Sequence, residues 1–225
     1  MKWEILHKPA YSLLKVILNS GESVKAEPGS FVMYKGDIEI KTKTGGILKG
    51  ALRKVLAGES LFLNEFISHS DNSEVYFAPV MPGDVEYIEL DGDEYLISDG
   101  SYLCSWGDVD IGIGWKGFSG FFMKGGLIWL KVAGEGGVWI NAYGALEKVE
   151  LPRGHRVIID NTHFVAVNST VKHRIRTFGG LKSTIFGGEG WVIEVEGPGT
   201  VFVQTRNIPG FLEIVKEFVK KKFKI

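Results

Sequence analysis

The stretch VELPRGHRVIIDNTHFVAV, from Val149 to Val167, contains the pattern that decides the fold, because the chain carries it three times. An apolar run meets a turn at Gly154, and a second turn then leads into an apolar run that contains an aromatic residue. Related stretches are VILNSGESVKAEPGSFVMY (16–34) and IELDGDEYLISDGSYLCS (88–105). Such self-similarity indicates a chain built from repeated structural units.

Two landmarks, a turn glycine and an aromatic residue, recur in each copy with the same interval between them. These pairs are Gly21 and Phe31, Gly92 and Tyr102, and Gly154 and Phe164. The copies also end on similar apolar runs, in which Val75, Val138 and Val201 are evenly spaced along the chain. We therefore predict three tandem units, over 1–82, 83–145 and 146–206, with a separate segment at 207–225.

The composition of the units predicts an all-β fold. Their apolar runs are short, rich in Val, Ile, Phe, Tyr and Trp, and separated by Gly, Asn and Asp, which is typical of an antiparallel sandwich or barrel. Strict alternation at 37–44 and 108–114 indicates half-buried strands. In the last segment, IPGFLEIVKEFVKKKFKI, apolar residues recur at helical spacing. This segment predicts a C-terminal amphipathic α-helix.

Composition also limits the classes of function. The formal net charge of −1 gives no overall field that would attract nucleic acid or an anionic membrane. A single cysteine, Cys104, excludes an internal disulfide and fits a reducing compartment, where we expect it as a buried, inert thiol. We see no signal peptide and no apolar run of the roughly 20 residues that span a bilayer. We therefore expect a soluble, cytoplasmic protein.

The glycine-rich stretch GGLKSTIFGGEGWVIEVEGPGTVFVQT (179–205) raises the question of phosphate binding. A phosphate-binding loop needs glycine directly before its Lys-Ser/Thr pair, so that backbone amides and the lysine face the same phosphate. Here Leu181 precedes Lys182. The pattern favours turn glycines of a β-repeat and an ordinary lysine at Lys182. Glu59 and Glu189 occupy matching turns, where a carboxylate that caps backbone amides is favoured over a catalytic one.

The remaining patterns give no catalytic constellation. The five histidines include no His-x-His pair of the kind that presents two ligands on one strand. Of these, His155, His163 and His173 fall in the third copy and could converge, although their spacing does not require it. No Gly-x-Ser-x-Gly nucleophile motif occurs. We therefore predict no enzyme activity and assign no catalytic, cofactor-binding or metal-binding residue.

The tail and the tryptophans have simpler explanations than nucleic-acid binding. Lysines of the tail could contact acidic lipid or nucleic acid, but the pattern favours a helix whose apolar face packs on the β-body while its lysines face solvent. The tryptophans lie within strand patterns and are not interleaved with arginine as a single-strand-binding surface requires. We expect no nucleic-acid partner, and a membrane surface only through the tail.

Three stretches together resemble one protein family. They are GGILKGALRKVLAGESLFLNEF, FAPVMPGDVEYIEL and GGLKSTIFGGEGWVIEVEGPGTVFVQTR. They are similar to a widespread prokaryotic family of unknown function, whose eukaryotic relatives are the altered-inheritance-of-mitochondria proteins of mitochondrial organisation. The similarity extends from Met1 to about Arg206. The middle copy departs most, since Met123 and Lys124 lie where the other copies carry Gly-Glu turns nearby.

The resemblance implies three TRAP-like units, a short form of the double-stranded β-helix named after the Trp RNA-binding attenuation protein, and a homotrimer. It brings no catalytic residues. Fold alone does not specify function. We expect a non-enzymatic β-rich scaffold or binding protein that assembles with itself. The alternatives are a small-molecule or metal binder of cupin-like type, and an organiser that associates with a membrane surface through the C-terminal helix.

Overall fold

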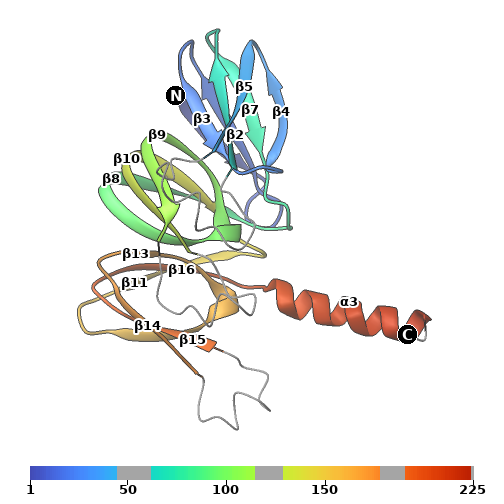
Figure 1. The fold of residues 1–225 in the computed structure, drawn as a ribbon, viewed down its shortest axis with the longest axis vertical. Helices are drawn as coiled ribbons and strands as arrows, with labels where there is room; N and C mark the ends of the chain where they lie inside the picture. Colours follow the sequence, from blue (N-terminus) through green and yellow to red (C-terminus); the bar gives the residue numbers. More distant parts are fainter. Residues whose placement is uncertain (45–61, 115–128, 178–190, 224–225) are drawn as a thin grey trace.

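The prediction of an all-β chain that ends in a helix is confirmed (Figure 1). The computed structural model describes residues 1–44, 62–114, 129–177 and 191–223. The strands of these segments pair antiparallel in three sheets, and α3 (Ile208–Phe223) follows the last strand. Two short 3-10 turns, η2 (Asp99–Ser101) and η3 (Asn161–His163), precede strands of the largest sheet.

The first sheet has four strands, and an apolar strand lies at its edge. Its order is β1 (Lys2–Leu6), β2 (Leu13–Leu18), β7 (Ser73–Phe77) and β4 (Phe31–Lys35). In β2 the alternation of apolar residues places Leu14, Val16 and Leu18 in the core. Among the described strands β4 pairs with β7 only, and all five residues of β4 are exposed.

The second sheet has nine strands drawn from the whole length of the chain. Its order is β11 (Leu146–Leu151), β16 (Gly199–Gln204), β13 (Phe164–Asn168), β8 (Val85–Ser98), β10 (Trp129–Asn141), β9 (Tyr102–Ile113), β3 (Ser23–Ala26), β6 (Phe62–Ser68) and β5 (Ile38–Thr44). The third sheet has three strands, in the order β12 (Arg156–Asp160), β15 (Trp191–Glu196) and β14 (Lys172–Thr177). Sheets therefore cross the boundaries predicted at 82/83 and 145/146, and the division into three units stays a prediction.

Strand pairing relates the three closing runs to one another. Val75 lies opposite Val16, Val138 opposite Ile88, and Val201 opposite Val149. The middle strands β8, β9 and β10 are long and continuous, whereas the corresponding parts of the chain before and after them are divided into shorter strands. Gly134 and Gly136 of β10 have positive φ and lie against the backbone of Trp106 and Asp108, where a Cβ atom would not fit.

Three apolar cores follow one another along the molecule, and two of them are completed by residues that come later in the chain. The first core packs β2, β3 and β7 residues against Leu103 and Trp139. The middle core similarly takes in Val165 and Phe202. The third core lies between β12, β15 and β16, and its largest members are Trp129 and Phe164, whose rings stack at 4.3 Å. Neighbouring parts of the chain are thus joined by shared apolar packing.

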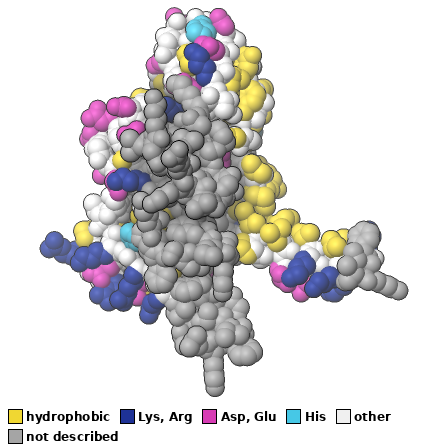
Figure 2. All heavy atoms as spheres, viewed as in Figure 1, with side chains coloured by type: hydrophobic (Ala, Val, Ile, Leu, Met, Phe, Trp, Pro, Cys, Tyr) yellow, Lys and Arg dark blue, Asp and Glu magenta, His cyan; other side chains and the backbone are white. Residues whose placement is uncertain are grey.

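The C-terminal helix differs from expectation in its surroundings. We expected its apolar face to pack on the β-body, but α3 projects away from it (Figure 1). Phe211, Leu212 and Phe218 are exposed, and the ring of Phe211 meets the β-body edge-on at Tyr143, with ring centroids 6.2 Å apart. Figure 2 shows hydrophobic side chains along the side of the molecule from which the helix leaves, and along one side of the helix itself. The helical spacing of apolar residues predicted the helix correctly, but it did not predict which surface contacts its apolar side.

Among the residues that the structure describes, no helix is long and apolar enough to cross a membrane.

Candidate functional site

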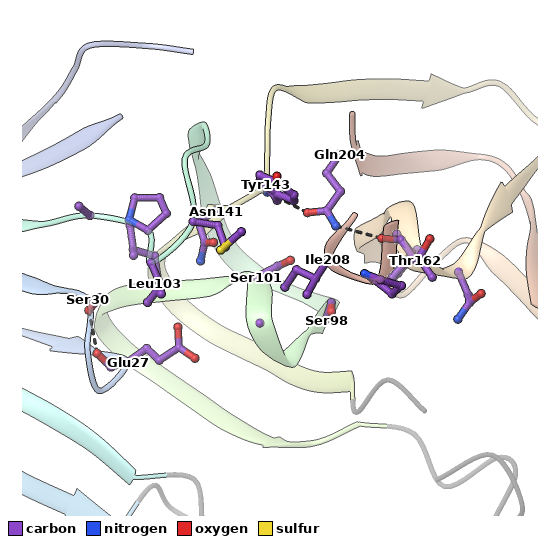
Figure 3. Close-up of a pocket in the computed structure, with 18 residues that line it drawn as sticks. Glu27, Ser30, Ser98, Ser101, Leu103, Asn141, Tyr143, Thr162, Gln204 and Ile208 are labelled. Carbon is purple, nitrogen blue, oxygen red and sulfur yellow. Dashed lines mark hydrogen bonds between the residues drawn. The ribbon is translucent and has the colours of Figure 1, made fainter. Parts of the chain in front are cut away.

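A cavity of about 460 Å³ lies at the base of the C-terminal helix (Figure 3). Its walls come from segments that are far apart in the sequence. Some are the turns that precede β4, β9 and β13, and others are the segments that follow β7, β10 and β16. The residues that line it include Glu27, Ser30, Ser98, Ser101, Leu103, Asn141, Tyr143, Thr162, Phe164, Gln204 and Ile208. Ligand cavities of proteins commonly have a volume of roughly 300–1,000 Å³.

Gln204 ties two walls of this cavity together. Its side-chain oxygen accepts a hydrogen bond from the backbone amide of Tyr143 at 2.9 Å, and its side-chain nitrogen donates to the backbone carbonyl of Thr162 at 3.0 Å (Figure 3). One amide side chain therefore satisfies a donor and an acceptor on two separate connections. Such pairing of backbone groups fixes the two connections relative to each other.

A second set of hydrogen bonds attaches the helix to the same wall. The Nδ1 atom of His163 donates to the backbone carbonyl of Gln204 at 2.7 Å, and Nε2 accepts from the side-chain amide of Asn207 at 2.7 Å. The side-chain oxygen of Asn207 accepts from the amide of Gly210 at 2.7 Å. Asn207 is therefore the N-cap of α3. The helix starts at a fixed point although its length is exposed.

The cavity combines apolar walls with hydroxyl and amide groups. Ser30 donates its hydroxyl to the backbone carbonyl of Glu27 at 2.7 Å, so that this hydroxyl is held in a turn rather than against a base. Leu103, Phe164 and Ile208 supply apolar walls. Serine hydroxyls and the Asn141 amide add groups that both donate and accept hydrogen bonds. The lining thus combines apolar side chains, hydrogen-bonding groups and the carboxyl group of Glu27.

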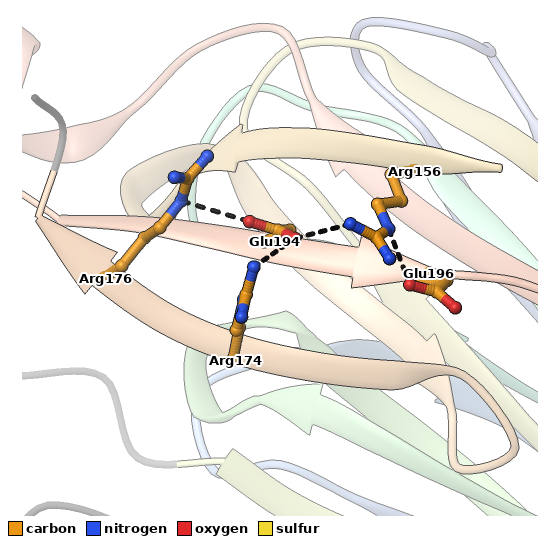
Figure 4. A network of polar contacts seen from close by, with 5 residues as sticks. All are labelled: Arg156, Arg174, Arg176, Glu194 and Glu196. Carbon is orange, nitrogen blue, oxygen red and sulfur yellow. Dashed lines mark hydrogen bonds and ion pairs between the residues drawn. The ribbon is translucent and has the colours of Figure 1, made fainter. Parts of the chain in front are cut away.

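An ion-pair network covers one face of the three-stranded sheet (Figure 4). Glu194 on β15 accepts from Arg174 at 2.8 Å and lies 3.1 Å from Arg176, while Arg156 pairs with Glu196 at 2.6 Å. The hydrogen bond from Arg174 and the neighbouring arginines hold the pKa of Glu194 below its usual value. The three arginines are exposed, and exposed ion pairs contribute little to stability because water and salt screen them. The network therefore links the three strands β12, β15 and β14 through side chains on one face of the sheet.

The structure places some of the residues singled out from the sequence and not others. Lys182, Glu59 and Glu189 lie outside the described residues. Cys104 is buried as expected, and burial raises the pKa of its thiol well above the usual range. A thiol held in its protonated form is a poor nucleophile, which agrees with the expectation of an inert cysteine.

The three histidines of the third copy do not converge. His155 is exposed in the turn before β12, where its backbone amide donates to the carbonyl of Pro152. His163 binds the helix cap, whereas the ring of His173 lies 5.6 Å from that of Trp129. Over the described segments, no group of three or more His, Cys, Asp or Glu side chains is placed to hold a metal ion.

The cavity residues were missed because turn residues carry little individual signal. Ser30, Ser98 and Thr162 are each common turn residues, and only their place before corresponding strands relates them. The alignment of the three sequence copies shows that these turns recur, but it does not show that they line one cavity. Gln204 has no such signal, because its role depends on the distance between two other segments.

Comparison with known proteins places the chain in a family. It is 29% identical over 231 residues to an uncharacterised protein of Streptococcus pyogenes serotype M6, covering 97% of this chain and 91% of that protein. Its structure is similar to a crystal structure of another Streptococcus pyogenes protein, with a TM-score of 0.79, 28% identity, and coverage of 96% and 99% of the two chains. A family described as Mitochondrial biogenesis AIM24 matches residues 3–206. The chain therefore belongs to the AIM24 family.

Proposed function

We propose that this protein is a non-enzymatic scaffold or binding platform that assembles into a homotrimer of TRAP-like units and acts in the cytoplasm. The observation that carries the proposal is the exposure of β4. Its residues Phe31 to Tyr34 are all large and apolar, and the strand has a free edge among the described strands. An exposed apolar edge strand is a template for pairing with another chain, and soluble proteins normally cover or charge it. Covering β4 with a second copy would remove this hazard.

Light scattering after size-exclusion chromatography tests the proposal. At micromolar concentration we expect a mass three times the chain mass of 24.9 kDa. A single species at the mass of one chain would overturn the assembly. A matched measurement at high salt separates apolar from ionic association, because salt screens exposed ion pairs and not apolar burial. We expect the trimer to persist.

A second candidate function is association with a membrane surface through α3. The specific observation in its favour is the exposed apolar side of the helix, including Phe211, Leu212 and Phe218, together with lysines in its last turn. An amphipathic helix of this kind can lie in the interface of an anionic bilayer. The test is flotation with vesicles of anionic lipid, comparing the full chain with a chain that ends at Arg206. Equal flotation of the two proteins would exclude this role for the helix.

A further inference from the structure

Two junctions within the chain are built from the same strand pairing. At the first junction β3 lies beside the start of β9, and at the second the end of β8 lies beside β13. The opposed residues are Lys25 and Ser105, and Ala26 and Cys104, at the first junction; at the second they are Leu96 and Val167, and Ile97 and Ala166. When the copies are aligned on their turn glycines and aromatic residues, these two registers are identical. Two independent junctions therefore follow one rule.

The same rule governs the packing at each junction. A register shift occurs at Leu103 in β9 and at Val165 in β13, and both side chains are fully buried. Leu103 belongs to the core formed mainly by β2, β3 and β7, and Val165 to the core formed mainly by β8, β9 and β10. Each junction thus inserts an apolar side chain into the core that precedes it. β4 has the corresponding register shift at Val32, whose side chain is 50% exposed.

Each junction pairs two strand positions, and among the described strands each of these positions has one strand with a free edge. β12 corresponds to β3 and pairs only with β15, while β4 corresponds to β9 and β13 and pairs only with β7. The register of the two junctions would place Ile158 opposite Tyr34 and Ile159 opposite Met33. Ile158 is 52% exposed and Tyr34 is 44% exposed. Both free edges therefore carry exposed apolar side chains at the positions that the rule brings together.

We propose that β4 of one copy pairs antiparallel with β12 of a second copy, in the register Ile158–Tyr34 and Ile159–Met33, and that Val32 enters the third apolar core. This inference rests on the proposed self-assembly and specifies its interface. The pairing places no like charges directly opposite each other, since Lys35 faces Val157 in this register. Met33 is longer than Cys104 and Ala166, but its flexible thioether chain adapts to irregular space.

The contact joins different surfaces of the two copies. β4 belongs to the upper end of the molecule in Figure 1, and the sheet that contains β12, β15 and β14 lies at the lower end. Such a head-to-tail contact leaves a free edge at each end of a dimer, so that further copies add until the ring closes. In the closed ring, β4 of every copy is covered by β12 of a neighbouring copy.

Disulfide cross-linking tests the register. The variants Tyr34→Cys and Ile158→Cys are purified separately, mixed, and oxidised, while native Cys104 is fully buried. Opposed residues of antiparallel strands have Cα atoms about 4.5–5.5 Å apart, which is within the range for a disulfide. We expect a covalent dimer in the mixture and none from either variant alone, because the contact joins unlike surfaces. Tyr34→Cys mixed with Ile40→Cys is the control, since Ile40 is an equally exposed residue of β5, another edge strand.

The outcomes separate this inference from the proposed function. At least about tenfold more covalent dimer in the matched mixture than in the control supports the pairing of β4 with β12. A trimeric mass without that excess overturns the pairing and leaves self-assembly standing. Covalent dimer from a single variant also overturns it, because it would show that like surfaces meet. A monomeric mass at micromolar concentration overturns both proposals.

Discussion

β4 and β13 carry the same sequence pattern but differ in what covers them. The first four residues of β13, Phe164 to Val167, are buried, whereas those of β4, Phe31 to Tyr34, are 38–50% exposed. β13 lies between β16 and β8, while β4 pairs with β7 alone among the described strands. Burial at this position therefore depends on the part of the chain that comes before the strand. β4 is the one of the three corresponding strands for which the described chain offers no such neighbour.

The largest expected effect is a loss of stability on truncation of a buried junction residue. Leu103→Ala removes a side chain that completes the first apolar core. We expect the free energy of unfolding to fall by about 2–5 kcal/mol, because the junction cannot fully close around the lost volume. Urea denaturation followed by tryptophan fluorescence measures it. A loss below about 1 kcal/mol would mean that the junction contributes little to the fold.

A smaller effect is expected for a substitution on exposed β4, and it should weaken association without changing the fold. Tyr34→Lys places a charge on the free edge of β4, and lysine on an edge strand opposes pairing with another chain. We expect association to weaken at least about tenfold, equivalent to about 1.4 kcal/mol. Light scattering across a dilution series measures this, and circular dichroism should remain that of the unsubstituted protein. An unchanged mass at every concentration would separate β4 from the assembly.

The sequence predicted strands and the C-terminal helix more completely than it predicted the difference in burial between β4 and β13. Alternation at 37–44 and 108–114 corresponds to β5 and to the end of β9, and the helical spacing of the tail corresponds to α3. These patterns are local, and local periodicity reports secondary structure directly. The exposure of β4 is not local, because Phe31 and Phe164 have the same pattern around them and differ only in the neighbouring strand. The cavity depends likewise on distant turns.

A third prediction concerns the ion pairs that hold β4 to its neighbour β7. Glu74 on β7 lies 3.0 Å from Lys35 of β4 and 2.6 Å from Lys15 of β2. Hydrogen bonds from Lys15, Tyr76 and Lys35 lower the pKa of Glu74 from 4.5 to about 2. A carboxylate whose pKa is lower in the folded state stabilises the fold above its unfolded pKa, and this contribution is lost as the pH falls toward the folded pKa.

The variant Glu74→Gln isolates that contribution. At pH 7 we expect it to lower the free energy of unfolding by about 1 kcal/mol, because the pairs are partly exposed. The difference from the unsubstituted protein should shrink as the pH falls from 4.5 toward 2. Urea denaturation at pH 7, 4.5 and 2.5 gives the comparison. A difference that is the same at all three values would show that the charge of Glu74 does not stabilise the sheet.

The smallest expected effect is the most informative, because it compares the loss of stability at exposed Val32 with that at the corresponding buried residues Leu103 and Val165. Val32→Ala, made in the Tyr34→Lys background and measured at a dilution where light scattering gives the mass of one chain, should change the free energy of unfolding by no more than about 0.5 kcal/mol. Its side chain is half-exposed, and none of the three cores formed by the described residues includes it. Val165→Ala in the same background should be clearly destabilising, since that side chain is buried in the middle core. Equal losses at Val32 and Val165 would mean that β4 already has a covering partner within its own chain, and that exposure of the strand is not the reason for assembly.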